Sequence, residues 1–500
     1  MAVTMAMMVA FGAKCTVVPD GEKDMTETVM EAVAQMKDGG EVELKEGTYH
    51  FYAEGAKAME FYISNHDQPM PRKVQLPLCG TKNLTMRGKG KGAKFVFHGI
   101  TTGILVMDAE GTKLENIDID WAVPPIGEAR IAGQREDGQV EMNWIVEGAD
   151  GTKGAWMLWD ADTRAIKPGT GDVFEFTQAC IGDVVSFRTW ERPAPAICLY
   201  RAKDTQFKDV RVHAAHGMGL LAQRSENVSW QGGGTFPREG CYCSTKADAT
   251  HFSNCKGKIS VCGARFEGMM DDAINVHSTC LKIEEMQEGR WIKCRYMHEQ
   301  AIGFEVFEPG ERLRFIRSRT LENGQETKVT AVERLDERTV VLTVEDTLEG
   351  YEAGDAVENA DWQPEVEFCG NTVKNNRARA ALFTTPGKVT VRDNLFDHVS
   401  GSAILFAGDA SNWFESGACR DVEISGNTFR ACLTSKYQFC NAVITVAPSV
   451  PDPAAQKTPY HRNIRVTDNR FEDTDEKLWE GESVAEVEWR GNTLGMSEGP

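Results

Sequence analysis

A short unit repeated through the C-terminal part of the chain constrains the fold most strongly. Each copy has an alternating apolar and polar segment, a Gly or Asp, an Asn, one further residue and an apolar residue. Two pairs of these asparagines lie 23 residues apart, which is about one coil of a parallel β-helix. A coil cannot bury its inward face alone, so coils must stack at the strand spacing of about 4.8 Å. We therefore predict a parallel β-helix, from copies at 364–373, 387–396, 420–429, 462–471 and 485–494, with weaker ones at 226–236 and 257–266.

Asn occupies the same position in each clear copy of the unit, which suggests how the turns are stabilised. Asn tolerates a left-handed backbone, and its amide can hydrogen bond to the Asn of the next coil. We therefore expect a ladder that includes Asn371 with Asn394 and Asn469 with Asn492. A β-propeller is the alternative all-β fold, but its blades contain four strands and about 40 residues or more. The single-strand unit disfavours it.

Two long segments interrupt the repeat, and we predict that each forms a small antiparallel β-barrel inserted into the solenoid. Helical periodicity is confined to residues 24–37, where an amphipathic helix would cover the open end of a sheet. Insertions on one face of a repeat array often form the walls of its binding site. The predicted organisation is 1–20 signal remnant, 21–121 cap and first coils, 122–192 first barrel, 193–280 coils with the acids, 281–360 second barrel and 361–500 final coils.

The composition of the chain limits the classes of partner that it can bind. The formal net charge is −20, and no Lys/Arg cluster offsets it, so a nucleic-acid partner is excluded. An anionic polymer is also disfavoured unless the cleft is locally basic, and a neutral sugar suits the chain better. After the N-terminus, no apolar run reaches the roughly 20 residues of a membrane helix, so we predict no transmembrane segment.

The cysteines and the N-terminus bear on the compartment. The chain has fourteen cysteines, several at apolar strand-like positions such as Cys262, Cys369 and Cys432, which we expect to be buried free thiols rather than a disulfide framework. The first dozen residues are apolar and reach small residues, but they lack a basic start. We predict a signal remnant and a secreted or periplasmic protein, with Cys15 as a lipid-attachment cysteine; the alternative is a buried first strand.

Three carboxylates form the strongest chemical pattern. Asp271 and Asp272 are adjacent, and Asp248 precedes Asp271 by 23 residues, which puts them on neighbouring coils. Crowded acids repel one another and shift each other's pKa values. Glycosidic cleavage needs one acid to protonate the leaving oxygen and one base to activate water, which inverting enzymes hold about 6.5–9.5 Å apart. The alternative is that some of these acids cap turns or bind a structural cation.

Polar and aromatic residues around this strip are candidates for sugar binding. No histidine pair has zinc-site spacing, so no metal is predicted. An exposed Trp beside acids suits a pyranose, whose apolar face stacks on the ring, although the same Trp could be a packing lid. The substrate-binding candidates are His216, His251, Asn275, His277, Arg377, Arg379, Trp413 and Glu415, with His213, Asp409, Tyr437 and Gln438 as weaker ones.

Several longer motifs resemble glycoside hydrolase family 110, the exo-acting α-1,3-galactosidases. The resemblance extends from about residue 20 to the C-terminus, insertions included. One departure is Cys280, where the family pattern leads us to expect an aromatic residue beside a subsite. The motifs that carry the resemblance are STKADATHFSNCKGKISVCGARFEGMMDDAINVHSTCLKI (244–283), YISNHDQ (62–68), IDIDW (117–121, containing Asp120), NRAR (376–379), TTPGKV (384–389) and AILFAGDASNWFESGA (403–418).

This resemblance implies a right-handed parallel β-helix and metal-free, cofactor-free inverting hydrolysis of terminal α-1,3-linked galactose, as on blood group B-type glycans. The family's catalytic acids fall on Asp248, Asp271 and Asp272, and Asp120 becomes a further substrate-binding candidate. We assign Asp271 as the general acid and give the other two the water-activating role, although the sequence does not show which acid is desolvated. The expected partners are a galactose-terminated oligosaccharide or glycoconjugate and a second copy in a homodimer.

Two other functions fit a β-helix with acids. A polygalacturonase-like hydrolase also combines this fold with paired aspartates, but here His216-Gly217 precedes the acids and no basic motif follows to pair a uronate. A non-catalytic glycan-binding solenoid would use the acids to ligate calcium. Fold alone does not decide between these.

Overall fold

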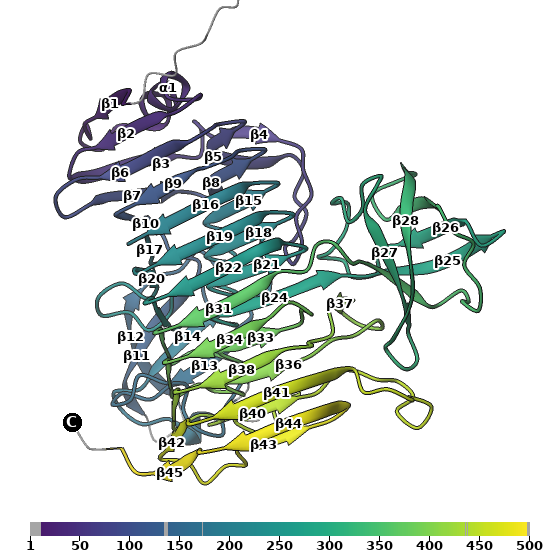
Figure 1. Cartoon of the computed structure of the whole chain (residues 1–500). Helices are drawn as coiled ribbons and strands as arrows, with labels where there is room; N and C mark the ends of the chain where they lie inside the picture. The colour runs from purple at the N-terminus through teal and green to yellow at the C-terminus, as the bar shows by residue number, and fades with distance from the viewer. Residues whose placement is uncertain (1–11, 135–138, 173, 436, 438, 498–500) are drawn as a thin grey trace, which may run out of the picture.

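The computed structural model describes residues 12–134, 139–172, 174–435, 437 and 439–497. Three long parallel sheets run along the solenoid, and consecutive coils add one strand to each (Figure 1). The predicted parallel β-helix is confirmed. Sheet A consists of β1 (Lys14–Val17), β2 (Gly40–Leu44), β6 (Leu84–Gly88), β9 (Lys113–Glu115), β16 (Lys203–Lys208), β19 (Glu226–Gln231), β22 (Lys256–Cys262), β31 (Glu365–Cys369), β34 (Val389–Arg392), β38 (Val422–Ser425), β41 (His461–Thr467) and β44 (Val484–Arg490).

Sheets B and C form the other two faces. Sheet B consists of β3 (Gly47–Tyr52), β7 (Ala93–His98), β10 (Ile117–Trp121), β17 (Arg211–Val212), β20 (Gly234–Thr235), β23 (Arg265–Glu267), β32 (Thr372–Lys374), β35 (Leu395–Asp397), β39 (Thr428–Arg430), β42 (Arg470–Glu472) and β45 (Thr493–Gly495). Sheet C consists of β4 (Lys57–Met59), β5 (Arg72–Cys79), β8 (Thr102–Met107), β15 (Ile197–Tyr200), β18 (Leu220–Gln223), β21 (Thr250–Ser253), β24 (Ile274–Thr279), β33 (Ala381–Phe383), β36 (Ile404–Phe406), β40 (Ile444–Val446) and β43 (Trp479–Gly481), and β37 (Glu415–Ser416) pairs antiparallel with β24.

The predicted asparagine ladder is present and continuous. The backbone N–H of Asn371 donates to Oδ1 of Asn394 at 2.9 Å, and the same contact links Asn394 to Asn427, Asn427 to Asn469 and Asn469 to Asn492. The left-handed backbone lies at the Gly or Asp before each Asn, not at the Asn itself. Each buried Asn amide thus bonds along the solenoid, while the preceding residue makes the turn.

The apolar residue that ends the repeat forms a second column, inside the core. The ring centroids of Phe396 and Phe429 lie 5.0 Å apart, and those of Phe429 and Phe471 lie 4.9 Å apart, each pair stacked. The N-terminal end of this core is covered by the predicted helix, α1 (Thr26–Gln35), whose Val29, Ala32 and Val33 are buried. Repetition of one apolar position therefore builds the interior of the solenoid.

The two inserted segments differ from each other. The second forms a closed barrel that projects from the side of the solenoid (Figure 1), with strand order β25 (Leu281–Gln287), β26 (Trp291–Arg295), β29 (Thr339–Val344), β28 (Glu322–Arg334), β27 (Arg312–Arg317) and β30 (Ala356–Asn359). The first forms a four-stranded antiparallel sheet instead of the predicted barrel, because β12 and β13 each pair with one neighbour among the described strands. Its order is β12 (Val140–Val146), β11 (Gly127–Gln134), β14 (Val184–Arg188) and β13 (Ala155–Trp159), with a 3-10 turn η1 (Phe176–Gln178).

One cysteine prediction was wrong. Cys262 and Cys369 occupy paired positions of β22 and β31, with Cα atoms 4.6 Å apart, and form a disulfide. Stacking of coils brings residues 107 positions apart into contact, which spacing in the sequence does not reveal. The other twelve cysteines are free, and most are buried, Cys432 included.

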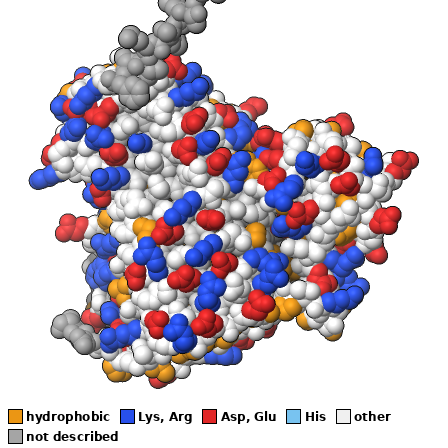
Figure 2. Space-filling model, viewed as in Figure 1, with side chains coloured by type: hydrophobic (Ala, Val, Ile, Leu, Met, Phe, Trp, Pro, Cys, Tyr) orange, Lys and Arg blue, Asp and Glu red, His pale blue; other side chains and the backbone are white. Residues whose placement is uncertain are grey.

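The surface and the termini complete the description. Basic and acidic side chains are interspersed over the face drawn in Figure 2. None of the described helices is long and apolar enough to cross a membrane. Most of the predicted signal remnant lies outside the described residues, whereas Cys15 lies in β1, paired with Val42 of β2.

Candidate active site

The acids lie where successive coils enter sheet C. The pairing of Thr250 with Ile274 and of Ile274 with Ala381 fixes the register of β21, β24 and β33. Two residues before these strands, the register places Asp248 level with Asp272, and Asp272 level with Arg379. The coil from β21 to β24 is thus 24 residues long, one more than the 23 expected, so the first acid aligns with Asp272 rather than with Asp271.

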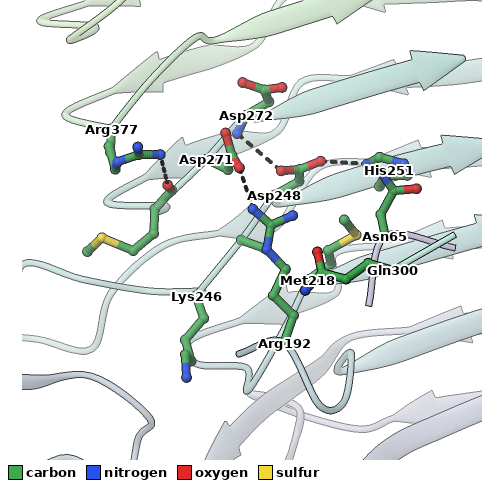
Figure 3. Close-up of polar contacts among 12 residues, drawn as sticks. Asn65, Arg192, Met218, Lys246, Asp248, His251, Asp271, Asp272, Gln300 and Arg377 are labelled. Atoms are coloured by element: carbon green, nitrogen blue, oxygen red, sulfur yellow. Dashed lines mark hydrogen bonds and ion pairs between the residues drawn. The ribbon is translucent and has the colours of Figure 1, made fainter. Parts of the chain in front are cut away.

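These residues border a cavity of about 300 Å³. Its wall contains Asp248 and Asp271 but not Asp272, which is fully buried behind them. Figure 3 shows the three aspartates close together, with His251 beside Asp248 and Arg192 reaching Asp271. One carboxylate oxygen from each of the three acids lies within 4.8 Å of the others. This separation is shorter than the sequence led us to expect.

Arginines hold Asp271 in its ionised form. Nη2 of Arg192 lies 2.9 Å from Oδ2 of Asp271, and Nη1 of Arg379 lies 3.7 Å from Oδ1. Burial alone would raise the pKa of Asp271, but the positive charges of Arg379 and Arg192, followed by Arg377 and Arg188, lower it to about 2. A carboxylate can accept a proton, so this environment suits a base rather than the general acid that we predicted from sequence.

The pKa values of the other two aspartates are raised instead of lowered. Burial, followed by the negative charge of Asp271, raises the pKa of Asp248 to about 8. Burial likewise raises the pKa of Asp272, although Arg379 donates to its Oδ2 at 2.9 Å. In the pocket wall, Asp248 is therefore the carboxyl that retains a proton near neutral pH.

Two histidines continue from Asp248 into the protein. Nδ1 of His251 lies 2.6 Å from Oδ2 of Asp248, and its Nε2 lies 2.8 Å from Nε2 of His277. His277 is buried behind the pocket wall, and its Nε2 lies 3.4 Å from Oε1 of Glu415. Burial lowers the pKa of His251 well below its ordinary value, so its ring is neutral. His251 therefore contacts both Asp248 and His277, and of the two rings only His251 lines the pocket.

The remaining candidates fill the pocket wall in different ways. Arg377 forms a bidentate ion pair with Asp172, and its guanidinium lies 5.2 Å from the ring centroids of both Trp190 and Tyr437. Asn275 lines the pocket with a buried Oδ1 that accepts no hydrogen bond from the described residues. Such an unpaired acceptor can bond a sugar hydroxyl.

The loop that carries Trp413 is more ordered than an open sugar platform. The Trp413 ring stacks on His298 of the inserted barrel, with centroids 3.7 Å apart. The carboxylate of Asp409 accepts from four backbone N–H groups of its own loop, so it caps the loop. Glu415 accepts from Nδ2 of Asn65 at 2.9 Å. One face of the Trp413 ring is thus already covered by His298, and Trp413 also lines the pocket.

Some predicted residues lie elsewhere. Asp120 pairs with Arg238 and Lys94 in sheet B, and it does not line the pocket. His216 is buried with its ring 6.0 Å from that of Trp121, and it is also absent from the pocket wall. His213 contacts Phe236, and Gln438 lies outside the described residues. Cys280 is buried against the 409–418 loop, where its N–H donates to the carbonyl of Phe414.

Asn65, Asp172 and Arg192 are among the pocket residues that were missed from sequence, as was His298, which stacks on Trp413 but does not itself line the pocket. They come from the first coils and from both inserted segments, far from the acids in the chain. Asn65 lies inside the YISNHDQ motif, which could have identified it. The other three stand at a turn, at the return to the solenoid and in a barrel loop, and nothing in their local sequence distinguishes them.

The acid cluster is one of two groups of described residues that could hold a cation; the other, Cys262, Glu367 and Cys369, contains the two disulfide-bonded cysteines. The positive charge that such a cation would bring is already supplied by Arg192 and Arg379, which contact Asp271 and Asp272 directly. Neutralisation of a buried carboxylate by a hydrogen-bonded guanidinium satisfies the same electrostatic need that a metal would meet.

Known proteins resemble this chain over most of its length. The alpha-1,3-galactosidase B of Akkermansia muciniphila is 42% identical over 92% of this chain, which spans 63% of that protein. The alpha-1,3-galactosidase B of Phocaeicola vulgatus is 37% identical over 98% of this chain and 91% of its own length. Residues 291–357 match the family model described as GLAA-B beta-barrel domain II. Among solved structures, an exopolygalacturonase from Thermotoga maritima has a TM-score of 0.39 at 13% identity, over 97% of this chain and 90% of that one.

The two alpha-1,3-galactosidase B relatives, 42% and 37% identical to this chain, place it among the glycoside hydrolases. The match to the Phocaeicola vulgatus protein, which covers 98% of this chain and 91% of that protein, identifies the family within this class. The chain belongs to glycoside hydrolase family 110, the family of the α-1,3-galactosidases.

Proposed function

We propose that this protein is an exo-acting glycosidase that releases terminal α-1,3-linked galactose from glycans of the blood group B type, with linear Galα1-3Gal as a second candidate substrate. We further propose an inverting, metal-independent acid–base mechanism. The observation that carries the proposal is the pair of carboxyls in the pocket wall, of which Asp271 contacts Arg192 and Arg379 while Asp248 contacts His251. These environments shift the pKa values of the two acids in opposite directions. A pocket of about 300 Å³ favours capture of one terminal sugar rather than a polymer chain.

The proposed roles follow from the environments of the acids. Asp248, protonated near neutral pH, donates its proton to the glycosidic oxygen as the bond to galactose breaks. The ionised Asp271 accepts a proton from the attacking water. Asp272 does not reach the pocket, and it acts by holding Arg379 against Asp271. This reverses the role that we assigned to Asp271 from sequence, because four arginines oppose its protonation.

The separation of the acids favours a second candidate mechanism. Retaining glycosidases place their carboxyl groups about 5–5.5 Å apart, and inverting ones leave about 6.5–9.5 Å for a water. One oxygen of each acid lies within 4.8 Å of one oxygen of the others, which is compatible with the closer arrangement, in which Asp271 would attack the sugar directly as a nucleophile. Inversion is supported by the family resemblance, and the anomer of the first product distinguishes the two mechanisms.

The first test is release of galactose from the B trisaccharide and from linear Galα1-3Gal, with polygalacturonate as the control. Release from either galactoside supports the proposed activity, and the ratio of the rates gives the preference for the branched glycan. Cleavage of the uronate polymer alone would refute it in favour of the polygalacturonase-like alternative. Binding of both galactosides without release would favour the non-catalytic solenoid.

The other sequence predictions remain proposals. Export from the cytoplasm is supported by the disulfide between Cys262 and Cys369, since such bonds persist in oxidising compartments. Lipid attachment at Cys15 and a homodimer stay predictions, testable by mass spectrometry of the mature protein and by analytical ultracentrifugation.

A further inference from the structure

The row of side chains that sheet C turns toward the pocket changes from polar to apolar along the solenoid. His251 of β21 pairs with Asn275 of β24. Asn275 pairs with Leu382 of β33, which in turn pairs with Leu405 of β36, and all four residues line the pocket. Each pairing advances one coil, so the row extends over three strand spacings, about 14 Å. One pyranose ring does not cover this length. The pocket floor therefore has a polar half at His251 and Asn275 and an apolar half that begins at Leu382.

The apolar half is separate from the core of the solenoid. Side chains alternate along a strand, so Phe406 of β36 belongs to the core cluster, whereas Leu405 beside it faces the other way. Leu405 packs with Leu382, Ala407 and Ala447 in a small cluster of their own, and these four residues make up the apolar half of the pocket. Leu382 and Leu405 are 4% and 2% exposed, so they form a floor rather than open surface. Such a floor favours a ligand that presents an apolar group to it.

The branched end of a B-type glycan matches these two halves. Its terminal galactose and its fucose are attached to adjacent carbons of one central galactose, so the two sugars lie side by side. Fucose is a 6-deoxyhexose, and its methyl group is the one fully apolar substituent of the trisaccharide. The acids and the unpaired Oδ1 of Asn275 lie at the polar half. With the terminal galactose there, where its bond is cleaved, the apolar half is the part of the floor that remains for the fucose.

We propose that the apolar half of the pocket is a subsite for the methyl group of a 6-deoxyhexose, and that it selects the branched galactoside over the linear one. This inference rests on the proposed function and specifies the substrate of the same site. The methyl group displaces water from Leu382 and Leu405, whereas a hydroxymethyl group in its place would give up hydrogen bonds to water. A change of one methyl-sized group in an apolar pocket alters discrimination by about tenfold or more.

The first experiment measures binding alone, so it does not depend on cleavage. Its ligands are the disaccharide Fucα1-2Gal and the matched disaccharide in which L-galactose replaces fucose, which differs only by a hydroxyl on the methyl carbon. Neither ligand contains an α-1,3-linked galactose. By calorimetry, we expect the wild-type protein to bind the fucose disaccharide about tenfold more tightly than its analogue. Equal affinities, or no binding of either disaccharide, would overturn the subsite.

The second experiment compares kcat/KM for the B trisaccharide and for linear Galα1-3Gal in variants of Leu405. Leu405→Asn keeps the approximate size of the side chain but removes its apolar surface, whereas Leu405→Met, the matched control, keeps both. We expect the ratio of the branched to the linear substrate to fall by about tenfold in Leu405→Asn and to stay close to the wild-type value in Leu405→Met. An unchanged ratio in folded Leu405→Asn, with equal losses on both substrates, would place the terminal galactose itself on this floor and refute the subsite.

A second variant guards against loss of the fold, because Leu405 is buried and Leu405→Asn places a polar group there. Ala407 is half-buried in the same apolar half, and Ala407→Gln fills the space proposed for the methyl group. We expect the same fall in the ratio. Wild-type protein that cleaves the linear galactoside without preference for the branched one would keep the proposed activity and refute the subsite. Release from neither substrate would refute the activity instead, and the calorimetry then decides the subsite by itself.

Discussion

Replacement of Arg192 by Gln tests whether arginines keep Asp271 ionised. The side chain of Arg192 is the nearest cation to Asp271, at 2.9 Å, and both groups are largely buried. Gln keeps a hydrogen-bond donor at this place but removes the positive charge. The backbone N–H of residue 192, which donates to Oδ2 of Asp67, is unchanged. The substitution therefore isolates the effect of the charge.

The size of the effect follows from the contacts. A pKa of about 2 in place of 3.8 corresponds to about 2 kcal/mol in favour of ionised Asp271. A charge pair about 4 Å apart contributes about 4 kcal/mol at an effective dielectric constant of 20, or about three pKa units. Loss of Arg192 leaves the burial penalty in place, and the new amide recovers part of the loss. We therefore expect the pKa of Asp271 to rise to about 4–5 in Arg192→Gln.

Stability should change with a defined pH dependence. A carboxyl whose folded-state pKa is depressed stabilises the fold above its unfolded pKa, and this contribution is lost as pH falls through the folded pKa. For Asp271 that window runs from about pH 4 down to about pH 2. Arg192→Gln should thus lower the free energy of unfolding by about 2–4 kcal/mol at pH 7. The difference from wild type should shrink as the pH approaches 2.

The assays are urea unfolding at several pH values and the pH profile of kcat/KM. The acid limb, which reports protonation of Asp271, should move from below pH 3 in wild type to about pH 4–5 in the variant. Arg211→Gln is the matched control, because Arg211 forms a comparable 3.0 Å pair with Asp118 outside the pocket, half-exposed. Its effect should be about 1 kcal/mol or less, with no shift of the limb. An acid limb that stays in place in Arg192→Gln would refute the role of the arginine.

Four further outcomes are expected. Asp271→Asn should lower turnover by about 10²–10⁴-fold while galactose binding, measured by calorimetry, persists; near-normal turnover would contradict the proposed base. Proton NMR of the first product should show β-galactose, whereas initial α-galactose would establish retention. Activity should survive EDTA, since arginines already balance the acids, and a loss restored by calcium would make the carboxylates a metal site. Cys262→Ser should lower the free energy of unfolding by roughly 2–4 kcal/mol, and reductant should have the same effect on wild type; no change in either would show that the bond contributes nothing.

The fold was predictable because its stabilising interactions repeat in the sequence. An Asn and an apolar residue recur at fixed places in each unit, and the structure uses them in a ladder and in a ring column. Lateral register was less predictable, since a coil of 24 residues instead of 23 changes which acids align. The disulfide was missed for a related reason. Coil lengths vary with the insertions, so contacts between coils do not follow from spacing alone.

The site was predictable only in its local part. Asp248, Asp271 and Asp272 stand close together in the sequence, and the structure brings them together too. The charges that determine their protonation come from elsewhere, with Arg192 at the end of the first insertion and Arg379 on the coil after the second. Sequence therefore predicted that the three acids lie together, but it did not contain the desolvation and the distant arginines on which their proposed roles depend.

The arginines of the pocket also bear on substrate class. From the sequence, we expected that so acidic a chain could accept a polyuronate only if its cleft were locally basic. The pocket wall does contain three arginines, but each has a carboxylate partner: Arg192 with Asp271, Arg377 with Asp172, and Arg379 with Asp271 and Asp272.

The charged side chains of the pocket wall sum to a negative net charge, which disfavours an anionic sugar. Its five carboxyls are Asp172, Asp248, Asp271, Asp409 and Glu415. With Asp248 protonated, four negative charges oppose the three positive charges of the arginines, which leaves a net charge of −1. A uronate entering this pocket would add a negative charge and compete with aspartates for guanidinium groups that are already engaged, whereas a neutral galactose needs only hydroxyl partners such as the unpaired Oδ1 of Asn275. The same carboxylates that hold the arginines in place therefore favour a neutral sugar over an anionic one.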